Sequence, residues 1–577
     1  MQGIGQVEIT PFPIPTAKLR AATVCFMALT LCCVAVAQTS NCNGRFEITI
    51  SAEVSTALTG RMFVFISKTD TPEPRQDGGT WYSRTELLGK DVEQLRTGSS
   101  SVLDGNELGY PLKSLNELPS GDYFVQALLN VYTQFRRSDG HVIWGHADQW
   151  EGQQFNRSPG NLYGSVQRVH LDPREGGCVK LLLDKKIAPV PVPPDSQWVK
   201  HIKIRSELLS RFWGTPIYLG ATILLPDGYE SHPNANYPVL YEQGHFSRRA
   251  PLDFDPTPLE PDPEREGELR WTGEISGYDF YKQWISSRFP RMIIITFQHP
   301  TIYFDDSYAV NSANNGPYGD AIMTELIPYI ESQYRIIREP YARALSGGST
   351  GGWASLALQI YHPDFFGGVW SFYPDPVDFT RYQLADIYHD ENAFQASGYD
   401  PPIPERPMER TVEGQADVTV RQMTQLEEVL GSRGRSGQQY DAWEAVYGPT
   451  DKDGYPMPLW DRRTGAIDRQ VAAYMRDHGY DLSYYLRQHW PEIGGLLVDK
   501  LHVYCGDMDN FFLDVSVSKF EQVLESTSNP YYGGTVEYGH PFKGHGWHSM
   551  NQAQLLGAIA AHIVKHAPAS ADISWRY

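Results

Sequence analysis

The stretch that decides the fold is Ala342-Arg-Ala-Leu-Ser-Gly-Gly-Ser349-Thr-Gly-Gly-Trp353. An apolar run leads into it and a run with helical periodicity follows, so the sequence predicts a strand, a tight turn and a helix. The turn, Gly347 to Gly351, has the form G-x-S-x-G. A serine on such a turn sits in a strained backbone conformation, and only small residues fit two positions to either side. We therefore expect Ser349 to be a nucleophile, and its rival Ser346 precedes the turn glycines.

A serine hydroxyl is a poor nucleophile unless a histidine takes its proton and an acid orients that histidine. On a strand-turn-helix elbow these partners follow in the order Ser, Asp, His. The predicted strand Leu501–Cys505 runs into a turn that offers Asp507 and Asp509. Three histidines follow before the last predicted helix: His540, His545 and His548. His545 is flanked by glycines, which leave room for the loop to reach the nucleophile, and spacing alone leaves the other two open.

From residue 198 onward, runs typical of strands alternate with runs typical of helices. The predicted strands are Ile217–Leu225, Pro238–Gln243, Met292–Phe297, Ala342–Ser346, Val369–Phe372 and Leu501–Cys505. The predicted helices are Tyr318–Gln333, Thr350–Tyr361, Phe520–Glu525 and Gln552–Lys565. This alternation predicts an α/β fold with a mostly parallel sheet covered on both faces. A polar, partly helical insertion at 376–499 would lie at the carboxyl edge of the sheet, so we interpret it as a cap or lid, and the alternative is a surface decoration.

The chain before this part has a different character. Short alternating runs between turn signals predict an all-β sandwich domain over residues 42–184. Four prolines in Ile187–Pro194 mark a stiff linker, placed at 185–197. Residues 198–577 would then form the second domain.

The first 37 residues have the parts of a secretory signal peptide. Lys18 and Arg20 precede an apolar run that ends in Ala35-Val-Ala37. We predict cleavage after Ala37 and a secreted or periplasmic protein, and the alternative is an anchor that stays in the membrane. Cys42 and Cys178 bracket the predicted β domain, and an oxidising compartment would permit a disulfide between them.

Composition excludes several classes of protein. The 577 residues can bury a large core, and six cysteines are too few for a disulfide scaffold. With 49 Lys and Arg against 69 Asp and Glu, the net charge is −20. Such a chain lacks the basic surface that binds phosphate backbones, so we do not expect nucleic acid as a partner.

Residues 198–577 resemble the esterase group of α/β-hydrolases that includes esterase D, feruloyl esterases and enterochelin-esterase-like proteins. Besides the elbow, the marks are Leu224-Leu-Pro-Asp-Gly-Tyr229, Tyr237-Pro-Val-Leu-Tyr241 and Tyr361-His-Pro-Asp-Phe-Phe366. The resemblance implies an α/β-hydrolase fold. It also implies that Asp509, which precedes Asn510 and Phe511, is the acid. His545, in a Gly-His-x-Trp setting, would be the base.

The oxyanion loop departs from the family pattern. Related enzymes have His-Gly after the Pro-Val-Leu-Tyr strand, whereas this chain has Gly244-His245. The N–H of Thr350, at the start of the elbow helix, is one expected donor. For the second donor we favour Phe246, with His245 next.

These residues together predict a secreted serine esterase that works through an acyl-enzyme, with Ser349, Asp509 and His545 as catalytic residues. The expected partner is a small-molecule or saccharide-linked ester. We expect no metal, no cofactor and no stable membrane insertion after signal cleavage. Two alternatives remain, which are an acyltransferase with the same triad and a catalytically impaired hydrolase that acts as a binding module.

Overall fold

The computed structural model describes residues 44–54, 56–260, 262–396, 398 and 405–577. The predicted signal peptide and Cys42 lie outside these residues, so cleavage and the disulfide stay predictions. None of the helices in the described ranges is both long and apolar enough to cross a bilayer.

An eight-stranded sheet organises residues 199–539. Its strands, in spatial order, are β13 (Val199–Ser206), β14 (Ile217–Leu224), β16 (Ile293–Gln298), β15 (Val239–Gln243), β19 (Arg343–Gly348), β20 (Gly368–Phe372), β23 (Leu501–Gly506) and β24 (Thr535–Gly539). All neighbouring pairs from β16 to β24 are parallel, and β14 is antiparallel to both of its neighbours. The prediction of a mostly parallel sheet is confirmed, while β13 and β24 at the two edges were not predicted.

Helices follow the strands. They are α2 (Glu207–Trp213), α3 (Pro263–Thr272), α4 (Gly277–Trp284), α5 (Tyr318–Ala321), α6 (Ile327–Gln333), α7 (Thr350–Tyr361), α12 (Leu513–Glu525) and α13 (Gln552–His566). A single π turn, Ile322–Leu326, joins α5 to α6 within the predicted helix 318–333. The predicted helix Phe520–Glu525 is only the second half of α12.

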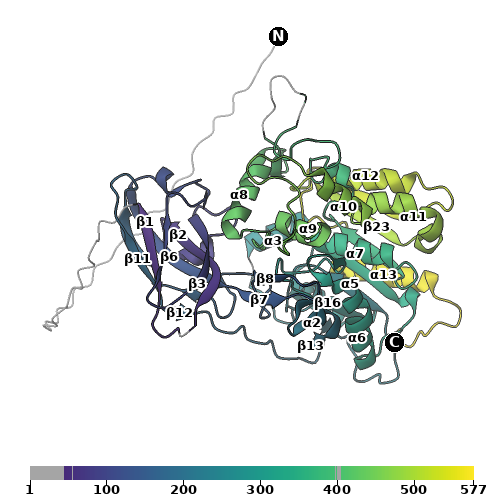
Figure 1. The fold of residues 1–577 in the computed structure, drawn as a ribbon. Helices are drawn as coiled ribbons and strands as arrows, with labels where there is room; N and C mark the ends of the chain where they lie inside the picture. The colour runs from purple at the N-terminus through teal and green to yellow at the C-terminus, as the bar shows by residue number, and fades with distance from the viewer. Residues whose placement is uncertain (1–43, 55, 261, 397, 399–404) are drawn as a thin grey trace, which may run out of the picture. The chain divides into compact units, whose positions relative to one another are not determined.

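Helices cover both faces of the sheet, as predicted. Adjacent side chains of β20 point to opposite faces because strands alternate. Trp370 meets the ring of His562 on α13 with centroids 5.2 Å apart, whereas the Ser371 hydroxyl donates to the Gly352 carbonyl on α7 at 2.9 Å. The helices α13 and α7 therefore lie on opposite faces (Figure 1).

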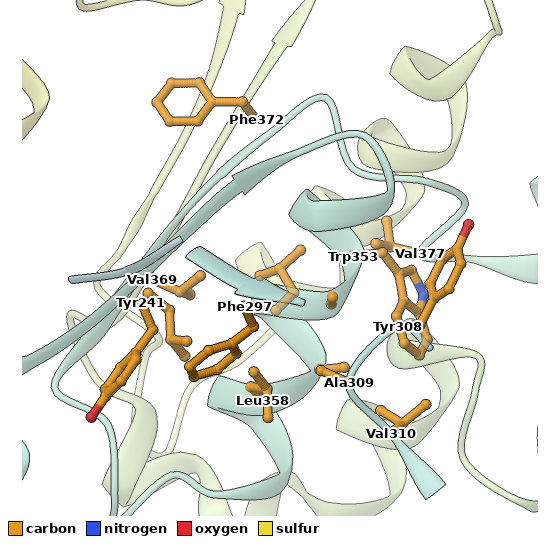
Figure 2. Close-up of a cluster of buried hydrophobic side chains, with 14 of the residues drawn as sticks. Tyr241, Phe297, Tyr308, Ala309, Val310, Trp353, Leu358, Val369, Phe372 and Val377 are labelled. Carbon is orange, nitrogen blue, oxygen red and sulfur yellow. The ribbon is translucent and has the colours of Figure 1, made fainter. Parts of the chain in front are cut away.

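The core under α7 is aromatic and aliphatic. Figure 2 shows Leu358 of α7 beside Tyr241 and Phe297, whose ring centroids are 5.4 Å apart. At the other end of the cluster, Trp353 of α7 packs against Tyr308, with centroids 5.7 Å apart. These contacts hold the first turn of α7, and with it the elbow, against the strands.

The N-terminal region is rich in strands: β1 (Arg45–Ile50), β2 (Leu58–Ser67), β3 (Glu86–Leu95), β4 (Ser100–Asp104), β5 (Gly109–Tyr110), β6 (Gly121–Val131), β7 (Thr133–Arg136), β8 (Val142–Gly145), β9 (Leu162–Tyr163), β10 (Gln167–Leu171), β11 (Val179–Leu183) and β12 (Lys185–Lys186). A three-stranded sheet, β11-β1-β4, and a sheet in the order β12-β9-β6-β2-β3-β5 bury side chains in one shared cluster. The strand β12 pairs with β9, so the first residues of the predicted linker belong to this second sheet. One short helix, α1 (Pro74–Asp77), precedes β3.

Between β20 and β23 lies the predicted insertion. It holds β21 (Pro407–Arg410), β22 (Ala416–Thr419), α8 (Val420–Leu430), α9 (Gln439–Tyr447), α10 (Arg469–Asp477) and α11 (Leu482–Leu497). Every residue of α9 after Gln439 is buried, although the segment reads as polar in sequence. Figure 1 shows α8 beside the N-terminal strands, where it contacts β3 and β5. At the other end of the insertion, α11 packs against α7 and α12.

Candidate active site

The turn around Ser349 has the strained geometry that its sequence predicts. Ser349 lies between the end of β19 and the first residue of α7, with φ 55° and ψ −122°. A Cβ on Gly347 would lie 2.5 Å from the Gly351 carbonyl oxygen, and a Cβ on Gly351 would lie 2.1 Å from the Gln243 carbonyl oxygen. Both positions therefore require glycine, because a backbone atom occupies the space that a side chain needs.

In this structure the Ser349 hydroxyl donates to a carboxylate that the sequence did not point to. Its acceptor is Oδ1 of Asp375, at 3.4 Å. The other oxygen of Asp375 accepts from the Tyr308 hydroxyl at 2.6 Å and from the ring N–H of Trp443 and the amide of Gln439, both at 3.0 Å. Asp375 is 3% exposed, and this burial raises its pKa although the donors act in the opposite direction.

His545 and Asp509 form the pair that was predicted. Nδ1 of His545 lies 2.9 Å from Oδ2 of Asp509, which is completely buried. The other oxygen of Asp509 accepts from the backbone N–H groups of Phe511 at 2.9 Å and Leu513 at 3.3 Å. The carboxylate is thus held by the start of α12, and the edge of the His545 ring is held between Phe511 and Tyr373, at centroid distances of 4.8 and 4.6 Å.

Ser349 and His545 line one cavity of about 150 Å³. Its other lining residues are Trp81, His245, Asp375, Gln383, Met408, Met423, Gln439, Tyr440, Trp443, Phe511 and Leu513. Six of these come from the insertion and one, Trp81, comes from the N-terminal β region. In the described part of the chain no hydrogen bond joins Ser349 to His545, so the hydroxyl would have to turn from Asp375 before the imidazole could take its proton.

The rival residues have structural partners. The Ser346 hydroxyl donates to the Trp370 carbonyl at 2.9 Å, inside the sheet. Asp507 pairs with His540 at 3.0 Å and accepts from backbone N–H groups of that turn. His548 lies 3.3 Å from the Tyr373 hydroxyl, and burial lowers its pKa to about 4. Of the two candidate serines only Ser349 lines the cavity, and of the three candidate histidines only His545 does.

The three expected oxyanion donors lie in different settings. Thr350 is the first residue of α7, where backbone N–H groups have no partner within the helix. His245 lines the cavity, whereas Phe246 is not among the lining residues. The Phe246 ring packs edge-on against Trp150 of the N-terminal region, with centroids 5.4 Å apart. The side chains therefore favour His245 over Phe246 as the residue nearest the cavity.

A cationic imidazole stands at the rim of the cavity. His245 is half-exposed, and its Nδ1 lies 3.1 Å from Oδ1 of Asp305 and 3.8 Å from Oδ2 of Asp306. The charge of Asp305 is the main cause that raises the pKa of His245 to about 10. These three side chains, and separately Asp499, His562 and His566, bring ligand atoms within 4.8 Å of one another, the spacing of a metal site. The expectation of a metal-free enzyme stays a prediction.

Sequence reasoning missed the residues that complete the cavity. Asp375 follows the end of β20, a position at which side chains gather at the carboxyl edge of a parallel sheet, so its place could have been predicted. Trp81 and Trp443 are far from the elbow in the chain, and no local pattern marks them.

The family model described as “Putative esterase” matches residues 218–445, which confirms the resemblance and fits an α/β-hydrolase fold. No curated protein matches the chain. Among solved structures, one similar chain is a ferulic acid esterase, at 18% identity over 63% of this chain and 98% of that one, with a TM-score of 0.37. An S-formylglutathione hydrolase from Agrobacterium tumefaciens is similar at 11% identity over 64% of this chain and 94% of that one, with a TM-score of 0.30. A ferulic acid esterase from Anaeromyces mucronatus, solved with ferulic acid, is similar at 15% identity over 63% of this chain and 89% of that one, with a TM-score of 0.26.

Proposed function

From the match of residues 218–445 to the esterase family, we propose that the protein is a serine esterase that hydrolyses a carboxylic ester through an acyl-enzyme. One observation carries the mechanism. Ser349, which has a strained backbone and a glycine two positions to either side, shares a cavity with His545. Nδ1 of His545 is paired with the buried carboxylate of Asp509. A nucleophile, a base and an acid that orients the base are the parts that acyl transfer needs.

In the first half of the reaction, Ser349 Oγ attacks the ester carbonyl carbon while Nε2 of His545 takes the hydroxyl proton. Asp509 holds the Nδ1–H tautomer and stabilises the imidazolium that forms. The negative charge that develops on the carbonyl oxygen is stabilised by the N–H of Thr350 and by the loop at His245, with Phe246 as the alternative donor. The tetrahedral intermediate collapses, the alcohol leaves with the proton from His545, and the acyl group stays on Ser349.

In the second half, water enters the cavity and gives a proton to His545 as its oxygen attacks the acyl carbon. The acid is released, and the proton returns to Ser349. Because an acceptor alcohol in place of water would make an acyltransferase with the same residues, product analysis with an added alcohol separates the two activities.

The substrate class follows from the cavity. A volume of about 150 Å³ has room for a group the size of a benzene ring. Its walls combine aromatic rings with the thioethers of Met408 and Met423. We infer an ester with one compact apolar group, either free or linked to a saccharide.

The domain arrangement remains part of the proposal. The two N-terminal sheets would form a sandwich over residues 42–184, and 198–577 would form the hydrolase, with a lid in 376–499. The lid is supported by the six residues it contributes to the cavity. With residues 1–37 as a signal peptide, the enzyme would act outside the cytoplasm.

The test replaces the nucleophile. Ser349→Ala should abolish turnover of p-nitrophenyl acetate and labelling by a fluorophosphonate probe. Ser346→Ala, which removes a hydroxyl from the strand β19 just before the turn, should keep both. Undiminished turnover in folded Ser349→Ala would refute the assignment, and a wild-type protein that the probe does not label would favour the binding-module alternative.

A further inference from the structure

Trp81 belongs to the N-terminal β region, in the loop between α1 and β3, and yet it lines the cavity that holds Ser349 and His545. The β region carries no catalytic pattern of its own. One of its side chains nevertheless forms part of the wall that a bound substrate would meet.

The Trp81 side chain is held in place from two directions. Its ring N–H donates to Oε2 of Glu409 at 2.7 Å, and Glu409 is buried and also accepts from the hydroxyl of the neighbouring Tyr82. The indole meets the Phe511 ring edge-on, with centroids 6.4 Å apart and an angle of 87° between the ring planes. Phe511 in turn packs against the ring of His545. Trp81 is therefore joined to the proposed catalytic base through one aromatic residue.

Several hydrogen bonds join the β region to helix α8 of the insertion. The Arg61 guanidinium, from β2, donates to the carbonyl oxygen of Glu428 at 2.7 Å and to that of Val429 at 2.9 and 3.1 Å. These carbonyls are at the C-terminal end of α8, where backbone oxygens lack helical partners and attract a cation. The amide of Gln425 donates to the Gly109 carbonyl at 2.6 Å. The same helix, α8, supplies Met423 to the cavity lining. The contact between α8 and the β region therefore positions Met423 and Trp81 relative to each other.

Gly89 shows how closely β3 approaches this helix. A Cβ at Gly89 would lie 2.0 Å from the Val429 carbonyl oxygen. Backbone approaches backbone directly, with no side chain between them, which leaves little freedom for the β region to shift against α8. The position of Trp81 is thus set by the fold and not by its own loop alone.

We propose that Trp81 is a substrate-contacting residue through which the N-terminal β region sets the selectivity of the esterase. Its indole forms the wall against which a planar aromatic acyl group of the ester packs, whereas an acetyl group is too small to reach that wall. This inference rests on the proposed function and adds to it a specificity residue from outside the esterase domain.

The experiment compares p-nitrophenyl benzoate with p-nitrophenyl acetate in the full-length enzyme. For Trp81→Ala we expect the ratio of the two kcat/KM values, benzoate to acetate, to fall about tenfold, because an aromatic contact of this kind is lost for one substrate only. Most of the change should be in KM for benzoate. Trp81→Phe keeps an aromatic wall and should recover most of the ratio, although it loses the hydrogen bond to Glu409.

Trp198→Ala is the matched control. It deletes an indole that packs against Phe254 and Tyr281, away from the lining residues of the cavity, and the benzoate-to-acetate ratio should stay at the wild-type value. If Trp81→Ala does not fold, Trp81→Leu provides the aliphatic variant, with benzoic acid inhibition as a second measurement. A ratio within twofold of wild type in folded Trp81→Ala or Trp81→Leu would overturn the inference. If the fluorophosphonate probe does not label Ser349 in the wild-type enzyme, the proposed function itself is overturned.

Discussion

Asp375 offers the sharpest prediction, because its two oxygens have different tasks. Oδ2 accepts from Tyr308, Thr350, Trp443 and Gln439, while Oδ1 accepts, within the described residues, only from the Ser349 hydroxyl. In Asp375→Asn the amide oxygen can take the place of Oδ2 and the amide NH2 the place of Oδ1. The four donors to Oδ2 then keep an acceptor, and the Ser349 hydroxyl becomes an acceptor whose own proton is free to point toward His545.

The magnitudes follow from this division. Hydrogen bonds to a charged group stabilise by about 1.5–3 kcal/mol and neutral ones by about 0.5–1.5 kcal/mol, but the amide also removes the cost of burying a carboxylate. We therefore expect the free energy of unfolding of Asp375→Asn to lie within about 1 kcal/mol of wild type. Asp375→Ala leaves a hole and takes away the common acceptor. Trp443 retains the Tyr308 oxygen as a second acceptor at 2.8 Å, so we expect a loss of about 2–4 kcal/mol.

Urea unfolding followed by tryptophan fluorescence gives the free energies, and p-nitrophenyl acetate gives the activity. Folded Asp375→Asn should retain turnover within about tenfold of wild type, because Asp375 positions the hydroxyl and takes no proton from it. If Asp375→Asn is folded but as inactive as Ser349→Ala, the carboxylate itself is needed in the reaction and the reasoning is wrong. If Asp375→Ala is as stable as Asp375→Asn, the hydrogen-bond accounting is wrong.

Two further predictions concern single carboxylates. In Asp509→Asn the amide NH2 faces Nδ1 of His545 and imposes the wrong tautomer, so kcat should fall about 10⁴-fold. The control, Asp507→Asn, removes a carboxylate that pairs with His540 and should leave kcat unchanged. Equal effects of the two variants on kcat would contradict the role of Asp509. Burial raises the pKa of Glu242 to about 7, so between pH 4.5 and 7 the native state keeps a proton that the unfolded chain has lost, and stability from this group falls as pH rises. The difference in unfolding free energy between wild type and Glu242→Gln should therefore fall by about 2 kcal/mol across that window, and a flat or rising difference in urea titrations would contradict the argument.

Local patterns predicted the interior of the large sheet well. Strands such as β16 are buried on both faces and read as continuous apolar runs. The elbow is recognisable from its glycines, which are required because backbone atoms occupy the space that a side chain would need. The edge strand β13, Val-Lys-His-Ile-Lys-Ile-Arg-Ser, was missed because its charged side chains suit a half-exposed edge. The start of α12 was missed because Phe512, its N-terminal neighbour, has a left-handed backbone and offers no capping side chain.

The site was predictable only where its residues follow the order imposed by the fold. Asp509 and His545 come after strand ends at the same edge of the sheet as Ser349, so sequence order and motif were enough to pair them. Trp81, Trp443 and Met423 reach the cavity through contacts between segments that are distant in the chain. Packing of that kind leaves no periodicity or spacing in the sequence from which it could be inferred.

The close approach of Gly351 to the Gln243 carbonyl means that some residues around the cavity can be substituted and others cannot. Gly351 touches the Gln243 carbonyl, so the nucleophile turn and the strand that leads to the His245 loop move only together. The cavity is also lined by Met408 and Met423, whose flexible side chains can adapt to different neighbours. Adaptation to new esters, in evolution or in a directed library, should therefore accumulate at these methionines and leave the elbow untouched.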